Sequence, residues 1–371
     1  MNIPRIFFKN LVMSIFIAAI VFGVTCPGYP FGVRPTGTKS GDVQLDIPFL
    51  LKGWYPSASR ITITMFTTPA HERVTNIIYG CDDENTDCRN CDGKYAPMPV
   101  IFGNQWNDNP GFELASTNTA FCKKYIGKTI RAPYHTACWY ILFRDGEKRA
   151  AKGEYFDAKS GNVLLYRVHF GDMQFLHSMG SRDGEPASVT KANIMMWAEF
   201  TYKLATEQMP RDVIPEQSDI KGMKEIFAGQ GRTAQQIFLR NDGTYHRDFP
   251  NVALGSLLHM IQDSFTLSHT ERGEPSGGKC PGTDHYSPGK IRTFHSYAHQ
   301  DKDKHKEADL QHAVDINVTS VPPTAVDVGR ALRTYVDSRA PWENVKHYLD
   351  CVFDLEDPAA GAGPGKDFQP D

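Results

Sequence analysis

Apolar residues repeat at helical spacing through the second half of the chain, and this pattern most constrains the fold. The spacing first appears at about Asp172 and predicts helices that include residues 252–267, 304–314 and 326–349. A strand-like alternation occurs only in short runs such as residues 61–65. These patterns predict a mainly α protein with a few short strands.

The segment at about 80–165 interrupts this pattern with prolines, scattered aromatics and several cysteines. We interpret it as a loop-rich insertion. Cys88 and Cys91 have the spacing of a zinc or redox pair, but the chain has no second pair of that kind. Disulfides in an oxidising compartment are therefore the expected state of the eight cysteines, and their pairing stays open.

The amino-terminal residues resemble an export signal. Arg5 and Lys9 precede an apolar run at 11–25, which is short for a membrane span of about 20 residues. We expect a signal peptide at 1–26, or alternatively an uncleaved membrane anchor, in a secreted or periplasmic protein. The remaining boundaries that we predict are an extended lead-in at 27–60, a main domain at 61–355 that contains the insertion, and a disordered tail at 356–371.

The net charge of −3 gives no basic surplus that would favour nucleic acid or an anionic membrane. This weakens a nuclease assignment without excluding it, because bound metal ions would add local positive charge.

Histidines concentrate near the carboxyl-terminal end. Seven of the thirteen lie between His259 and His312. His259 and Asp263 are four residues apart on a predicted helix, so their side chains share one face and can bind one metal ion. His305 and Asp309 repeat the spacing. An isolated pair of this kind is more often an ion pair that stabilises a helix, but two pairs with His269 close by favour a metal site.

Three upstream residues are weaker candidates. Asp108 lies in an Asn- and Pro-rich turn, where a plain Asx turn is an equally good interpretation. His177 follows Phe175 and Leu176, and a histidine in such a setting is often a core residue. His169 competes with it for the same role, and His71 stands near a predicted helix start.

Read in order, these residues resemble the zinc-dependent phospholipase C and S1/P1 nuclease superfamily. The resemblance covers roughly residues 65–315 and implies a helical bundle with two or three zinc ions. It implies a first ion held by Asp108, His177, His259 and Asp263. It implies a second held by His269, His305 and Asp309, and a third shared by Asp263 and His71. Asp108 would also act as a general base.

The chain departs from the family pattern in three places. Gln262 stands where the family usually has Gly before the helix Asp, and Leu267-Ser268 stands where Pro is usual before the trailing His. The gap between Asp108 and His177 is longer than in the family. The family's third zinc uses the amino group of an amino-terminal Trp, whereas the nearest Trp here is Trp54.

The resemblance implies zinc-dependent hydrolysis of phosphodiester bonds, with Asp108 and Asp263 as the catalytic carboxylates. We expect a phospholipase C that acts on phosphatidylcholine-like lipids through transient contact with a membrane surface, with no obligate protein partner. The alternatives are a single-strand nuclease and a non-catalytic exported zinc-binding protein. Several aromatic residues could line a substrate pocket or belong to the core: Trp106, Trp139, Tyr140, Phe143, Tyr166 and Phe175.

Overall fold

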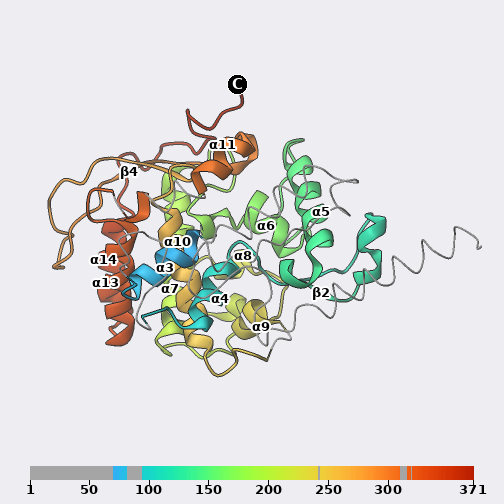
Figure 1. Cartoon of the computed structure of the whole chain (residues 1–371), viewed down its shortest axis with the longest axis horizontal. Helices are drawn as coiled ribbons and strands as arrows, with labels where there is room; N and C mark the ends of the chain where they lie inside the picture. Colours follow the sequence, from blue (N-terminus) through green and yellow to red (C-terminus); the bar gives the residue numbers. More distant parts are fainter. Residues whose placement is uncertain (1–69, 82–93, 241–242, 310–315, 319) are drawn as a thin grey trace, which may run out of the picture.

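The computed structural model describes residues 70–81, 94–240, 243–309, 316–318 and 320–371 (Figure 1). Helices dominate these residues, which confirms a mainly α chain with a few short strands. The α-helices are α3 (Ala70–Ile78), α4 (Met98–Trp106), α5 (Ala132–Ala150), α6 (Leu164–Phe170), α7 (Ala187–Ala205), α8 (Met223–Ile226), α9 (Ala234–Leu239), α10 (Phe249–Asp263), α11 (Lys302–Glu307), α13 (Ala325–Asp337) and α14 (Trp342–Val352). The 3-10 helices are η1 (Ala120–Tyr125), η2 (Gln174–His177), η3 (Pro215–Gln217) and η4 (Tyr297–His299).

Helix α10 lies at the centre of the molecule and packs mainly against α4 and α7. Its crossing with α4 depends on two glycines. A Cβ on Gly255 would lie 2.0 Å from the carbonyl oxygen of Val100, and one on Gly103 would lie 1.9 Å from that of Val252. The two backbones can meet this closely only because both positions lack a side chain. The crossing lies one turn before His259 and so brings the loop after α4 against the histidine-bearing end of α10.

Aromatic side chains fill the core on either side of α10. Trp106 of α4 stacks on Trp197 of α7 at 5.9 Å between ring centroids, and Phe238 of α9 packs against both. The six aromatic residues that the sequence offered for a substrate pocket or the core are all buried: Trp106, Trp139, Tyr140, Phe143, Tyr166 and Phe175. They therefore belong to the core.

Two antiparallel pairs of short strands complete the described fold. Strand β1 (Phe112–Glu113) pairs with β2 (Thr129–Ile130), and β3 (Thr270–Arg272) pairs with β4 (Ile291–Phe294). The second pair begins directly after His269, whose carbonyl accepts a hydrogen bond from the backbone of His295. This pairing holds the chain that follows α10 close to the end of the helix.

Disulfides join Cys122 to Cys138 and Cys280 to Cys351, and Cys81 is disulfide-bonded as well. This use of cysteine indicates an oxidising compartment. Among the described residues, no helix has the length and apolar character needed to cross a membrane. The predicted signal or anchor, the lead-in, the strand at 61–65, Trp54 and the Cys88/Cys91 pair all lie outside the described residues.

The predicted insertion at about 80–165 is more ordered than expected. The Cys122–Cys138 disulfide closes part of it, as anticipated, but α5 is a long helix and α4 belongs to the central core. The sequence suggested loops because prolines were interpreted as breaks, whereas α4 and α5 each have a proline in their first turn. In α4, Pro lies in the first turn and Gly103 permits the close helix crossing.

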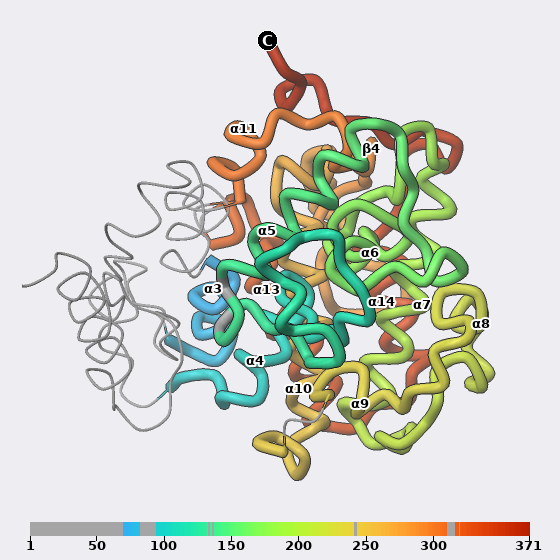
Figure 2. The backbone as a smooth tube through the Cα atoms, turned by 90° about the vertical axis from the view of Figure 1, so that its right-hand side faces the viewer, coloured from blue at the N-terminus to red at the C-terminus, as the bar shows by residue number. Residues whose placement is uncertain are grey.

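The expectation of a disordered tail at 356–371 is also wrong. Backbone hydrogen bonds join Gly184 to Ala362, Ser296 to Gly363 and Asp301 to Phe368. The tail therefore pairs with segments near α7 and at the start of α11, as Figure 2 shows at the carboxyl-terminal end. The tail is rich in Gly, Pro and Ala, and this composition predicted disorder. Backbone hydrogen bonds nevertheless hold it in place, because they do not require apolar side chains.

Two predicted helices differ in extent. The region 326–349 forms two helices, α13 and α14, because the chain turns at Arg339, which has a φ of 50°, and α14 begins after Pro341. The helix predicted at 304–314 corresponds to α11, which ends at Glu307, and residues 310–315 lie outside the described part of the chain.

Candidate metal centre

The eight residues singled out in the sequence converge on one region around the end of α10. Three groups have ligand atoms close enough to bind a common cation, with all atoms of a group within 4.8 Å of one another. The groups are His177/His259/Asp263, His71/Asp108/His259 and His269/His305/Asp309. His259 belongs to two of the groups, which makes them adjoining sites.

Asp263 lies at the centre of this arrangement and is fully buried. Its Oδ2 lies 2.9 Å from His177 Nδ1 and 3.0 Å from His259 Nε2. Its Oδ1 lies 3.3 Å from His71 Nε2 and 3.5 Å from His269 Nδ1. The two oxygens thus face different sets of imidazoles, which is the geometry required of a carboxylate that bridges two cations.

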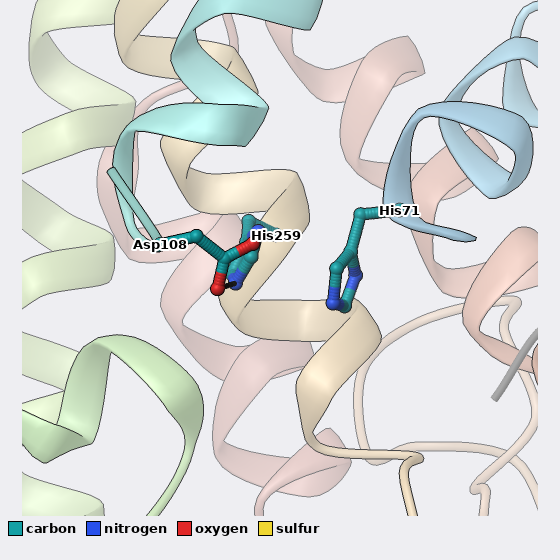
Figure 3. A group of neighbouring side chains, drawn as sticks. All are labelled: His71, Asp108 and His259. Atoms are coloured by element: carbon teal, nitrogen blue, oxygen red, sulfur yellow. Dashed lines mark ion pairs between the residues drawn. The ribbon is translucent and has the colours of Figure 1, made fainter. Parts of the chain in front are cut away.

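Figure 3 shows His71 of α3 and Asp108 of the loop after α4 approaching His259 of α10. Asp108 Oδ1 lies 3.8 Å from His259 Nε2 and 3.9 Å from His177 Nδ1. The resemblance placed Asp108 with His177, His259 and Asp263. The structure allows that set and also groups Asp108 with His71.

The third group forms where the chain leaves α10. His269 Nε2 lies 3.1 Å from Asp309 Oδ1, and His305 Nε2 lies 2.6 Å from Asp309 Oδ2. Helix α10 ends at Asp263, so His269 can turn away from the helix axis toward α11. This group has the same three members as the second ion site that the resemblance implied.

Buried polar side chains hold the loops that carry the candidate ligands. Asn107 donates from Nδ2 to the carbonyl of Leu176 at 2.8 Å and accepts from Ser256 Oγ at 2.6 Å. One side chain therefore ties the Asp108 loop to η2 and to α10. Next to His177, Ser178 adopts a left-handed φ of 51° and donates to the carbonyl of Met260 at 2.7 Å. No sequence pattern marks Asn107 or Ser178 as a positioning residue, although each is adjacent to a candidate ligand.

Hydrogen bonds also orient three of the imidazoles. Nδ1–H of His269 donates to the carbonyl of His177 at 2.8 Å, and Nδ1–H of His305 donates to Gln300 Oε1 at 2.5 Å. Nδ1–H of His71 donates to Gln262 Oε1 at 3.0 Å. With Nδ1 used in this way, each Nε2 faces Asp263 or Asp309 and is the nitrogen that would bind a metal ion in place of a proton.

Gln262 departs from the family pattern, and the structure gives it a role. The side chain is fully buried, and its Nε2 donates to Thr75 Oγ1 at 2.8 Å. That bond sets the direction of the amide and leaves Oε1 to accept from His71 and from Asn104 Nδ2. Gln262 therefore positions His71, which a glycine could not do.

His169 lies beside the groups and belongs to none of the three. Its Nε2–H donates to the backbone carbonyl of Asp108 at 2.9 Å, and its ring stacks on that of His177 at 5.3 Å between centroids. Burial is the main cause that lowers its pKa to about 3, so the ring is neutral. The structure places His177 among the possible ligands and His169 as a support for the Asp108 loop.

The charges of the buried groups depend on one another. Burial opposes ionisation of Asp263, but the surrounding imidazoles outweigh it and hold the pKa well below the usual range. The pKa of Asp309 is held well below its usual range in the same way, by His305 and His269. Burial alone would lower the pKa of His269, yet Asp263 and Asp309 raise it to about 9. Buried Asp263 and partly exposed Asp309 thus both stay ionised, and His269 is a cationic partner of both.

The donor set fits a divalent cation such as zinc. It consists of imidazole nitrogens and carboxylate oxygens, the ligands that zinc accepts alongside thiolates, and the described cysteines are used in disulfides. Within the described part of the chain, buried Asp263 Oδ1 and His269 Nε2 make no hydrogen bond of acceptable geometry. A cation at these atoms would compensate their burial.

Three candidate ligands are open to solvent. The side chains of Asp108, Asp309 and His71 are 39%, 28% and 16% exposed, whereas that of Asp263 is 1% exposed. The centre is therefore closed on the α10 side and accessible on the side of Asp108.

Comparisons with known proteins do not place this chain. No protein-family model matches it, and neither curated proteins nor solved structures give a significant match. The interpretation of the centre therefore rests on the geometry of its own residues.

Proposed function

We propose that this chain is a zinc-dependent phosphodiesterase with a fold of the phospholipase C and S1/P1 nuclease type. The supporting observation is the convergence of eight imidazole and carboxylate side chains from α3, η2, α10, α11 and the segments that follow α4, α10 and α11. Two of their groups share His259, and the two oxygens of Asp263 face different sets of imidazoles. A single storage or structural site would not need a shared carboxylate with oxygens facing two sets of ligands.

His71, Asp108, His177, His259 and Asp263 would hold one or two ions beside each other. His269, His305 and Asp309 would hold a further one. When bound, such ions supply Lewis acidity that activates water and offsets the charge that develops on the phosphate oxygens.

Asp108 and Asp263 have different roles in this proposal. Asp263 is buried and ionised, and its hydrogen bonds to His177 and His259 hold these rings in place. Asp108 is partly exposed on the open side and held by its neighbours Asn107 and His169. It can accept the proton of an attacking water, which is the role of a general base.

The open side favours catalysis over zinc storage. Storage is best served by closed tetrahedral ligation, whereas a catalytic site keeps an accessible position. The exposure of Asp108 and Asp309 provides that access. We propose phosphatidylcholine-like lipids as the substrate class. Like the activity, this choice is based on the resemblance to the phospholipase C and S1/P1 nuclease superfamily.

One preparation tested on two substrates separates the candidates. Purified protein loaded with zinc is incubated with phosphatidylcholine vesicles and, separately, with single-stranded DNA. Release of phosphocholine that chelation abolishes supports the phospholipase. Cleavage of DNA alone would assign the nuclease activity instead. Binding of zinc without hydrolysis of either substrate would identify a non-catalytic zinc-binding protein.

A further inference from the structure

The segment from η1 to the start of α5 presents apolar and basic side chains to solvent. Phe121, Ile126 and Tyr134 have exposed fractions of 45%, 46% and 63%. These three residues and the exposed lysines between them, Lys123, Lys124 and Lys128, are called the η1 patch below. Exposed large apolar residues gathered within so short a stretch are typical of an interaction surface.

The charge of this region is opposite to that of the whole protein. Residues 114–143 contain no Asp or Glu, although the chain has a net charge of −3. Lys123, Lys124 and Lys128 make no ion pair among the described residues, whereas Lys203 and Lys346 pair with acidic neighbours. Lys124 Nζ lies over the rings of Phe121 and Tyr125, at 4.6 Å and 4.9 Å from their centroids. Positive charge and exposed apolar side chains therefore occur together in this short segment.

The patch is held rigidly and is connected to the candidate metal centre. The Cys122–Cys138 disulfide closes the segment, and the pairing of Phe112 with Ile130 fixes its base. Phe112 follows the Asp108 loop, and Phe143 of α5 packs against His169, which holds that loop. Figure 1 shows the segment around β2 and the start of α5 at the opposite side of the molecule from α13 and α14.

We propose that the η1 patch docks the protein on anionic lipid surfaces. Aromatic and aliphatic side chains favour the membrane–water interface, and lysines bind the negative headgroups while their methylene chains cover apolar surface. Because the segment is linked to the Asp108 loop through Phe112 and His169, we expect docking to deliver lipid to that side of the centre. The delivery of lipid to the metal centre rests on the proposed function. Docking on the lipid surface does not, because it needs neither metal nor hydrolysis.

Binding is measured by cosedimentation of the purified protein with vesicles, in the presence of a chelator so that no lipid is hydrolysed. Vesicles of phosphatidylcholine are compared with vesicles of phosphatidylcholine and phosphatidylserine. We expect binding to the mixed vesicles that weakens as salt is added. Each lysine near such a surface contributes roughly fivefold to the binding constant, so K123Q/K124Q should bind about 30-fold more weakly. F121S/I126S should also lose binding.

Matched variants test whether the effect belongs to the patch. K221Q/K224Q removes two exposed lysines elsewhere, and Y286S removes another exposed aromatic. Both should bind as the unchanged protein does, and all variants should keep its unfolding temperature. Equal loss in the control variants, or no loss in the patch variants, would overturn the proposal. So would tighter binding of a single-stranded oligonucleotide that competes with vesicles. Docking without hydrolysis in the metal-loaded protein would reject the proposed function and leave the docking surface intact.

Discussion

Asp263→Asn is the substitution that tests the candidate centre most directly. The carboxylate has nitrogen atoms of four imidazoles within 3.5 Å, belonging to His177, His259, His71 and His269. An asparagine keeps the shape but removes the charge and one acceptor oxygen. Losing a group that only orients a metal ligand costs roughly 10–100-fold in metal affinity. Because Asp263 faces two sets of ligands, we expect the loss to reach at least about 100-fold.

The same variant should also destabilise the protein without metal. The pKa of Asp263 lies well below its usual range, so the carboxylate is charged at neutral pH and stabilises the folded state there. Breaking a buried charge pair by removing one partner costs about 3–5 kcal/mol. Chelator-treated protein should therefore unfold at a clearly lower temperature after the substitution.

Zinc content by mass spectrometry, zinc titration and hydrolysis of phosphatidylcholine are the assays. Asp263→Asn should lose more than one ion per chain together with turnover, because the Asp263 oxygens face imidazoles of all three groups. Asp309→Asn should lose one ion, because Asp309 pairs only with His269 and His305. Asp219 is exposed and distant from the groups in sequence, so Asp219→Asn is the control for a charge change. Full zinc content and full turnover in Asp263→Asn would refute the bridging role.

Three further predictions follow from the same geometry. Zinc-loaded protein should contain two or three ions, and chelation should abolish hydrolysis until zinc is restored; activity that survives complete removal of metal contradicts the proposal. Gln262→Ala should weaken zinc binding at His71 by roughly 10–100-fold, because His71 loses the acceptor that orients it. The ion at His269 should stay bound. Zinc titration distinguishes the two ions, and equal weakening of both would reject the positioning role of Gln262. In metal-free protein the raised pKa of His269, about 9, contributes stability that is complete below about pH 6.5 and lost as the pH rises to 9. Calorimetry should show this decrease, and an equal decrease in His269→Gln would show that another group causes it.

Local patterns in the sequence predicted what lies within one element. The spacing of His259 and Asp263 placed both on one face of α10, and the structure gives 3.0 Å between their side chains. His305 and Asp309 behave in the same way at 2.6 Å. Helical periodicity also predicted the helical class, since burial of one face follows from the 3.6-residue repeat. The helix break before Pro341 was missed although proline is a local signal. The order of the tail was missed because it depends on where the chain packs.

The sequence by itself therefore determined the helical class, the two His–Asp pairs and the residues that could bind metal. Tertiary structure alone decided which of them meet. His71 and Gln262 are 191 positions apart, and their hydrogen bond exists only because α3 packs against α10. Asp108 reaches His259 because Gly103 and Gly255 let two helices cross closely. Local periodicity is a property of neighbouring residues, whereas such contacts depend on how whole helices pack, which no short stretch of sequence encodes.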